Sequence, residues 1–142
     1  MFRQLTNDIF VSPQITEQDI AEAAKLGVTL VINNRPEDES EDQTPGNAIE
    51  RAARSAGMDY VAIPVTHSGF SQPQVKAMSA ALEKADGPVL AYCRSGTRST
   101  LLWALAESSQ GGDPDALTNI AAKAGYDINP VRPLMDMLKA QA

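Results

Sequence analysis

The chain has 142 residues, a length that fits one domain, 1–142, with a core large enough to need no disulfides. Its single cysteine excludes an intrachain disulfide framework, and its single histidine, His67, leaves few ways to build a metal site. A formal net charge of −6 argues against general nucleic-acid binding, which requires a basic face. The sequence shows no signal segment and no run near the ~20 apolar residues of a membrane span, so a cytoplasmic protein without a membrane partner is expected.

Strand and helix signals alternate along the chain. Short apolar runs indicate strands, and apolar residues at helical spacing between start and stop signals indicate helices. In chain order the pattern predicts strand 8–11, helix 17–26, strand 28–33, helix 44–57, strand 60–65, helix 71–87, strand 89–92, helix 99–109, helix 113–125 and helix 134–140. This alternation predicts an α/β fold, with a mostly parallel sheet of four to five strands flanked by helices and a C-terminal helical tail.

The most polar residues of the chain follow the ends of the expected strands. In parallel sheets, ligands bind beyond the carboxyl ends of the strands. We therefore expect the loops after strands 28–33, 60–65 and 89–92 to meet at one edge of the sheet, bringing together Asn34 and Arg35, His67, and residues 93–98. The acidic run 37–42, Glu-Asp-Glu-Ser-Glu-Asp, is interpreted as a solvated loop.

Cys93 is the strongest candidate for a catalytic residue. It ends an apolar strand and directly precedes a helix, where free backbone N–H groups and the helix dipole favour an anionic sulfur and attract other anions. A lone cysteine is often only a small buried hydrophobe, but two arginines and a glycine within six residues suit a hydrophobic core poorly. The segment therefore predicts a nucleophile, Cys93, with Arg98 as its catalytic partner, in an anion-binding loop made of Arg94, Ser95, Gly96, Thr97 and Ser99.

Three further residues could contribute to this site. His67 could act as a general acid or base, or it could be a solvated loop residue. Arg35 could complete the anion pocket, or it could pair with the acidic run at Glu37 and Asp38. Among the loop hydroxyls, Ser99 is the best candidate to contact the cysteine or its adduct.

Several stretches of the chain resemble the phosphatase-like domain of the beta-lactamase hydrolase-like proteins, a bacterial family with the dual-specificity protein phosphatase fold. The matching stretches run in order along nearly the whole chain: IFVSPQ (9–14), VINNRP (31–36), IPV (63–65), LAYCRSGTRS (90–99), LWAL (102–105) and AGYD (124–127). The resemblance implies a fold similar to that of protein-tyrosine and dual-specificity phosphatases.

The chain departs from the phosphatase pattern at the reactive loop. Phosphatases of this fold carry His-Cys, five residues and Arg, with an Asp general acid in the loop after an earlier strand. Here Tyr92 replaces the histidine, four residues separate Cys93 from Arg98, and the loop 64–68 contains no carboxylate. The Cys-Arg-x-Gly-x-Arg spacing is similar to the active loop of rhodanese-type sulfurtransferases.

These departures favour sulfur transfer as the first functional hypothesis. Cleaving a phosphate ester gains about 10²–10⁴ in rate from a placed proton donor, whereas sulfite and thiolate leaving groups need little protonation. The first hypothesis is a sulfurtransferase that moves sulfane sulfur from thiosulfate or a low-molecular-weight persulfide through a persulfide on Cys93.

Two alternatives remain open. One is a cysteine-based phosphatase with a phosphocysteine intermediate on Cys93 and either His67 or water as the proton donor. The other is a non-catalytic module that binds anions or persulfides. No cofactor is expected, the substrate is a small anion or thiol, and the resemblance implies a persulfide dioxygenase as a partner.

Overall fold

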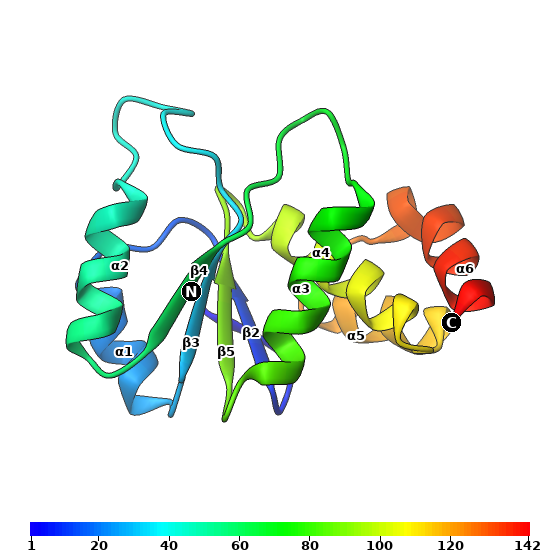
Figure 1. The fold of residues 1–142 in the computed structure, drawn as a ribbon, viewed down its shortest axis with the longest axis horizontal. Coiled ribbons are helices and arrows are strands. Elements are labelled where there is room, and N and C mark those ends of the chain that lie inside the picture. Colours follow the sequence, from blue (N-terminus) through cyan, green and yellow to red (C-terminus); the bar gives the residue numbers. More distant parts are fainter.

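The computed structural model describes residues 1–142 and contains one five-stranded sheet with helices on both faces (Figure 1). The strand order is β1-β2-β5-β3-β4, with β1 Arg3–Thr6, β2 Ile9–Ser12, β3 Leu30–Asn33, β4 Asp59–Ala62 and β5 Val89–Tyr92. Strands β2, β5, β3 and β4 run parallel, and only β1 is antiparallel to its neighbour. The prediction of a mostly parallel α/β sheet is confirmed.

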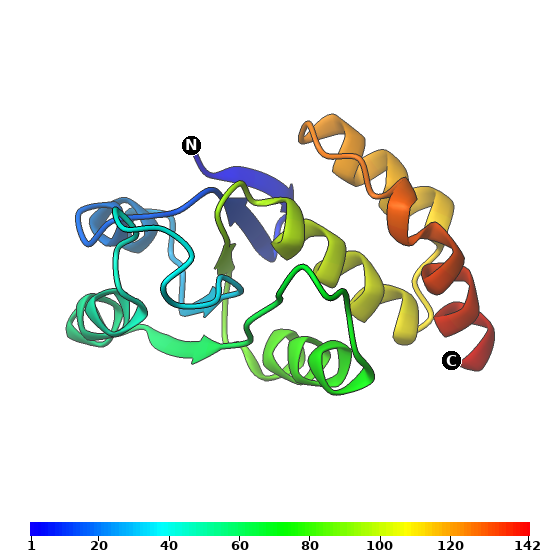
Figure 2. The ribbon, with the colours of Figure 1, turned by 90° about the horizontal axis from the view of Figure 1, so that it is seen from above.

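The helices form one layer on each face of the sheet (Figures 1 and 2). One layer consists of α1 Asp19–Lys25 and α2 Gly46–Ser55, and the other of α3 Gln72–Lys84, α4 Thr97–Ser109, α5 Pro114–Lys123 and α6 Arg132–Gln141. A short 3-10 turn, η1 Asn129–Val131, leads into α6. All six predicted helices are present, and none of them is both long and apolar enough to cross a membrane.

Strand β1 and the start of α4 differ from the sequence-based prediction. Residues 3–6 were not predicted as a strand, because in this edge strand only Leu5 is buried and the run has no continuous apolar signal. Helix α4 begins at Thr97, two residues earlier than predicted, because Gly96 adopts a left-handed φ of 90° and serves as its N-cap. Arg98 therefore lies in the first turn of α4.

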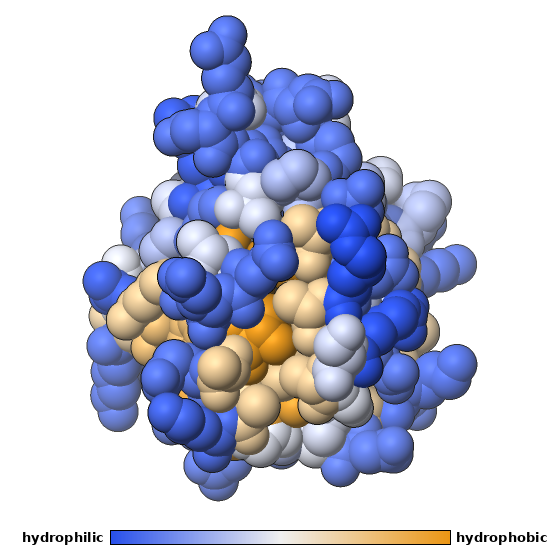
Figure 3. All heavy atoms as spheres, turned by 90° about the vertical axis from the view of Figure 1, so that its left-hand side faces the viewer, coloured by the Kyte–Doolittle hydropathy of each residue, from blue (hydrophilic) through white to orange (hydrophobic).

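Two apolar layers bury the sheet on both sides. The larger layer packs the sheet against α3, α4, α5 and α6 and includes Trp103, which is 2% exposed. The smaller layer packs the sheet against α1 and α2 and includes Tyr92. Figure 3, which views the molecule from the side of α1 and α2, shows an apolar surface region ringed by polar side chains, with polar loops projecting above it.

The central strand β5 positions the reactive loop. All four of its residues are buried, and it pairs with β2 on one side and β3 on the other. Tyr92 lies in register with Ser12 and Asn33, so the loops after all three strands start at the same level of the sheet. Cys93, the next residue, therefore lies in the middle of the sheet edge formed by the carboxyl ends of the strands, where ligands bind in parallel sheets.

Candidate active site

The loop 93–98 joins the carboxyl end of β5 to the start of α4 and surrounds the cysteine sulfur. Cys93 has no exposed surface, and the backbone N–H of Gly96 donates a hydrogen bond to its Sγ at 3.1 Å. The positive end of the α4 dipole faces the same place. The local geometry thus stabilises negative charge on the sulfur and on any anion bound beside it.

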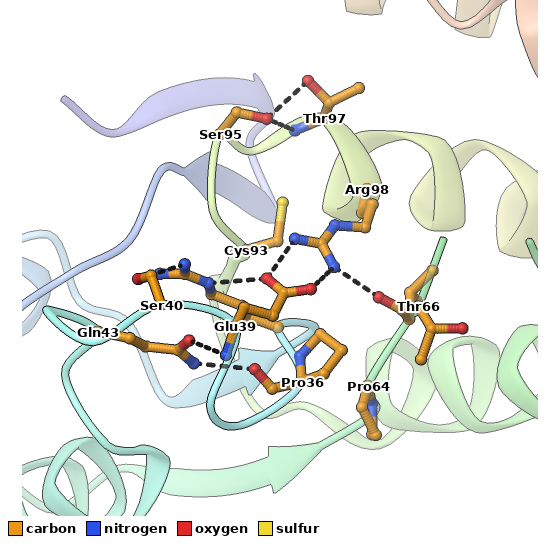
Figure 4. A network of polar contacts seen from close by, with 12 residues as sticks. Pro36, Glu39, Ser40, Gln43, Pro64, Thr66, Cys93, Ser95, Thr97 and Arg98 are labelled. Carbon is orange, nitrogen blue, oxygen red and sulfur yellow. Dashed lines mark hydrogen bonds and ion pairs between the residues drawn. The ribbon is translucent and has the colours of Figure 1, made fainter. Parts of the chain in front are cut away.

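Arg98 holds together the three loops that meet at this edge. Its Nη1 and Nη2 donate to Oε2 and Oε1 of Glu39 at 2.7 and 2.8 Å, a two-pronged pairing with one carboxylate. Its Nη1 also donates to the carbonyl of Val65 at 2.7 Å. Glu39 follows β3 and Val65 follows β4, so Arg98 links the loops after β3, β4 and β5 (Figure 4).

Glu39 was not among the candidates found from the sequence, which treated the acidic run as a solvated loop. That interpretation was wrong for this residue, because the Glu39 side chain is only 16% exposed and lies between two arginines. The hydrogen bond from Arg98 lowers the pKa of Glu39 to about 2, against an opposing effect of burial and with further lowering by Arg35. In return, the hydrogen bond with Glu39 raises the pKa of Arg98.

Arg35 is buried beside the reactive loop, and each of its three guanidinium nitrogens donates a hydrogen bond to another side chain. Its Nε donates to Glu39 Oε1 at 2.9 Å, its Nη1 to Gln14 Oε1 at 3.0 Å, and its Nη2 to Ser40 Oγ at 3.2 Å. Arg35 therefore pairs with the acidic run, which was one of the two roles considered for it. Because its partner, Glu39, also pairs with Arg98, Arg35 belongs to the same polar network as the reactive loop. The ion pair is with Glu39, not with Glu37 or Asp38.

Asn34 and Ser99 form buried hydrogen bonds that connect the elements around the reactive loop. The Ser99 hydroxyl donates to Asn34 Oδ1 at 2.8 Å, and Asn34 Nδ2 donates to the carbonyl of Ile63 at 2.9 Å. Both side chains are buried, so their hydrogen bonds tie α4 to the ends of β3 and β4. The sequence suggested that the Ser99 hydroxyl contacts the cysteine or its adduct. In the structure this hydroxyl donates its hydrogen bond to Asn34 instead.

The remaining candidates lie on the exposed side of the site. Ser95 Oγ and Thr97 Oγ1 are hydrogen-bonded to each other at 3.0 Å at the surface of the loop. Arg94 is exposed, and its side chain makes no hydrogen bond within the chain. His67 is likewise exposed, in the loop after β4, without a hydrogen bond to the site.

Two tyrosines border the reactive loop on opposite sides. Tyr92 directly precedes the loop, and its side chain is buried in the smaller apolar layer with no hydrogen-bond partner for its hydroxyl. Burial raises the pKa of this hydroxyl. Tyr126, which follows α5 and was not predicted as a site residue, donates to the carbonyl of Ser95 at 3.1 Å. The guanidinium of Arg3 lies 5.6 Å from the centre of the Tyr126 ring, so the N-terminal strand and the helical tail together hold this side of the loop.

Several solved structures share this architecture. A candidate phosphatase from Neisseria meningitidis is 32% identical and superposes with a TM-score of 0.84 over 96% of both chains. A candidate phosphatase from Shewanella putrefaciens is 27% identical, with a TM-score of 0.77 over 99% of this chain and 91% of the other. PTPMT1, at 13% identity and a TM-score of 0.77 over 99% and 98% of the two chains, shares the fold.

The sequence relatives agree with the structures. A beta-lactamase hydrolase-like protein from Xylella fastidiosa is 34% identical over 119 residues, which are 83% of this chain and 28% of the relative. The chain thus spans little more than a quarter of the length of that relative. The sequence profile of the beta-lactamase hydrolase-like protein, phosphatase-like domain, matches residues 1–112. The resemblance seen in the sequence is therefore confirmed: the chain belongs to this phosphatase-like domain family and has the fold of the cysteine-based protein-tyrosine phosphatases.

Proposed function

We propose that this protein hydrolyses phosphate monoesters through a phosphocysteine intermediate on Cys93. This reverses the order of the two enzymatic hypotheses drawn from the sequence. The first hypothesis, sulfur transfer, depended on two departures from the phosphatase pattern: the loop 64–68 has no carboxylate, and only four residues separate Cys93 from Arg98. The observation that carries the proposal is the placement of Arg98, which Glu39 holds beside Cys93 and whose remaining N–H groups can bind the oxygens of a phosphoryl group. The phosphatase relatives support the same choice.

The geometry suits phosphoryl transfer in two steps. In the first, the Cys93 thiolate attacks phosphorus, an S–P bond forms, and the P–O bond to the leaving group breaks. In the second, water attacks the phosphocysteine, the S–P bond breaks, and inorganic phosphate and the thiolate are released. The amides of residues 94–98, the α4 dipole and Arg98 stabilise the negative charge on the phosphoryl oxygens in both steps.

Sulfur transfer is the second candidate, and the loop length favours it. Only four residues separate Cys93 from Arg98, which makes a smaller anion cradle than the five-residue spacing of protein-tyrosine phosphatases. A small cradle suits a persulfide sulfur better than a tetrahedral phosphoryl group. In this reaction Cys93 would take the outer sulfur of thiosulfate, release sulfite, and pass the sulfur to a thiol or to cyanide.

Parallel assays of the full chain test the proposal. One measures phosphate release from 4-nitrophenyl phosphate, and the other measures thiocyanate formation from thiosulfate and cyanide. Intact mass after a brief incubation with each donor reports whether Cys93 gains a phosphoryl group or a sulfur atom. We expect phosphate release and a phosphoryl adduct. Thiocyanate and a sulfur adduct without phosphate release would support the sulfurtransferase, and no turnover of either substrate would support a binding module.

A further inference from the structure

We propose that Tyr126 is a positioning residue, which orients the Ser95–Gly96 peptide so that its N–H faces the sulfur of Cys93. The inference rests on the proposed function only in taking Cys93 as the nucleophile, and it applies to either reaction of that thiol. It gives a role in the site to the segment after α5, which lies beyond the residues 1–112 that the family profile matches.

Two hydrogen bonds that define this arrangement belong to one peptide unit. The Tyr126 hydroxyl donates to the carbonyl of Ser95 at 3.1 Å. The N–H of the same peptide, which is that of Gly96, donates to Cys93 Sγ at 3.1 Å. In a planar trans peptide the C=O and the N–H point in opposite directions. A hydroxyl that holds the carbonyl on one side of the loop therefore keeps the N–H directed at the sulfur on the other side.

The residues of the loop do not fix this orientation by themselves. Turning the Ser95–Gly96 peptide over mainly changes ψ of Ser95 and φ of Gly96. Gly96 has a φ of 90°, and glycine adopts negative φ values as readily as positive ones. The turned peptide would present the Ser95 carbonyl to the sulfur, where its oxygen would disfavour a thiolate or a bound anion. A contact from outside the loop is needed to exclude this state, and Tyr126 provides it.

The neighbouring carbonyls of the loop have backbone partners of their own. The carbonyl of Arg94 accepts from the backbone N–H of Gln14 at 3.2 Å. The carbonyl of Gly96 accepts from the backbone N–H and the hydroxyl of Thr100 at 3.1 and 2.8 Å. The Ser95 carbonyl lies between them, and its partner is the tyrosine hydroxyl. Removing that hydroxyl therefore tests one peptide of the loop and leaves the partners of its neighbours in place.

The backbone of Tyr126 is fixed by the way in which α5 ends. Its N–H donates to the carbonyl of Ala121 at 2.9 Å, and the N–H of Gly125 donates to the carbonyl of Ala122 at 3.0 Å. Gly125 has a φ of 93°, and this pair of hydrogen bonds around a left-handed residue is the Schellman ending of a helix. The position of the tyrosine thus follows from the end of a regular helix.

The side chain of Tyr126 is confined between strand β1 and the reactive loop. On one side, Arg3 donates to the carbonyl of Ala124 at 2.7 Å, and its guanidinium lies 5.6 Å from the centre of the tyrosine ring. On the other side, the hydroxyl is so close to Gly96 that a Cβ at that position would collide with it. Burial raises the pKa of Tyr126, so the hydroxyl keeps its proton and remains a donor.

The charges around the sulfur come from other residues. Arg98, from α4, lies beside the cysteine, and Glu39, from the loop after β3, acts on the sulfur through its ion pair with Arg98 (Figure 4). Arg94 is exposed, and β2 contributes neutral Ser12, whose carbonyl accepts from the cysteine N–H at 3.3 Å. Tyr126→Phe replaces one neutral side chain with another. A change in the pH dependence of the sulfur in this variant would therefore report the orientation of a dipole, because no charge is altered.

The test compares Tyr126→Phe with the wild type through the rate at which iodoacetamide alkylates Cys93 at a series of pH values. Cys93 is the single cysteine of the chain, and its alkylation requires the thiolate but no phosphate or sulfur donor. Tyr92→Phe is the matched control, because it removes a hydroxyl without a hydrogen-bond partner from the residue next to Cys93. Thermal melts confirm that both variants are folded.

We expect the alkylation profile of Tyr126→Phe to move to higher pH by about half a unit or more, since the charged sulfur loses an oriented donor. The profile of Tyr92→Phe should stay that of the wild type. For 4-nitrophenyl phosphate, kcat/KM should fall about tenfold in Tyr126→Phe, less than when an oxyanion donor is removed outright.

Three results would overturn the role of Tyr126. These are an unchanged profile, an equal shift in both variants, and a rate that changes by the same factor at every pH. The last would mean that only access to the buried sulfur had changed. A shifted profile in a protein that releases no phosphate from 4-nitrophenyl phosphate would instead support the role of Tyr126 and overturn the proposed function.

Discussion

The reactive loop, residues 93–98, and the acidic loop, residues 35–43, meet at one edge of the sheet but are built in different ways. The reactive loop acts mainly through its backbone, in which Gly96 donates to the sulfur and starts α4 with a left-handed φ. The acidic loop contributes one side chain, Glu39, held by an arginine 59 positions away in the sequence. The environment of Cys93, the proposed nucleophile, thus depends on local geometry, whereas the pairing of Glu39 with Arg98 depends on the whole fold.

Replacing Cys93, the proposed nucleophile, tests the reactive loop alone and should have the largest effect on activity. Cys93→Ser is almost isosteric, so we expect a folded protein whose turnover falls by at least about 10³-fold, as when a covalent nucleophile is removed. Steady-state kinetics and thermal melts measure the two properties separately. Residual activity above a few per cent would move the nucleophile to another residue.

Replacing Arg98 tests the connection between the two loops. Lysine retains the positive charge but cannot hold two oxygens of Glu39 or of a phosphate at once. We expect Arg98→Lys to lose kcat/KM by about tenfold or more, which corresponds to about 1.4 kcal/mol of transition-state stabilisation.

Arg94→Lys is the comparison for that prediction. The Arg94 side chain is exposed and makes no hydrogen bond, so the same exchange should cost less there. Kinetics on both variants, with thermal melts to confirm folding, decide the matter. Wild-type kinetics in Arg98→Lys would show that the fork of Arg98 does not bind the reacting anion.

The sequence predicts the fold and the reactive loop well because their signals are local. Alternating strand and helix patterns indicate the parallel sheet, and Cys93, Gly96 and Arg98 lie within six residues of each other. Strand β1 escapes detection because it is an exposed edge strand stabilised by pairing with β2 rather than by burial. Strand β1 contributes to the site only through tertiary contacts, among them the contact of Arg3 with the ring of Tyr126.

Glu39 shows why the rest of the site could not be predicted. In the sequence it is one of five acidic residues in the run 37–42, and composition favours a solvated loop for all of them. Which of them turns inward depends on the left-handed turn at Asp38 and on two arginines that the fold brings together. One sequence signal existed, since the acidic run follows β3 at the same edge of the sheet as the reactive loop.

A comparison of two glycines isolates the backbone contribution of the reactive loop to stability. Gly96 and Gly111 both have a positive φ, at 90° and 93°, but Gly111 lies in open space. A Cβ at Gly96 would collide with the Tyr126 hydroxyl. We expect Gly111→Ala to lower the free energy of unfolding by about 1–2 kcal/mol, the cost of the left-handed conformation, and Gly96→Ala to lower it further.

Urea denaturation of the two variants measures this difference. Adding Tyr126→Phe to Gly96→Ala removes the hydroxyl oxygen that the new Cβ would meet, so the double variant should recover part of the additional loss. Equal losses at the two glycines would mean that Tyr126 does not constrain the reactive loop.

The smallest expected effect is the dependence of stability on pH that comes from the acidic loop. The pKa of Glu39 is about 2 in the folded protein, mainly because Arg98 donates to it, and 4.5 is its ordinary value. A carboxyl group with a lowered pKa stabilises the folded state above its ordinary pKa, and this contribution is lost as the pH falls toward the folded value. The wild type should therefore lose its stability advantage over Glu39→Gln as the pH falls from about 4.5 toward 2.

Glu41→Gln is the control, because exposed Glu41 has no such partner and this variant should follow the wild type throughout. Urea denaturation at a series of pH values measures all three proteins. Parallel curves for Glu39→Gln and the wild type across that range would mean that the ion pair joining the two loops does not stabilise the folded protein.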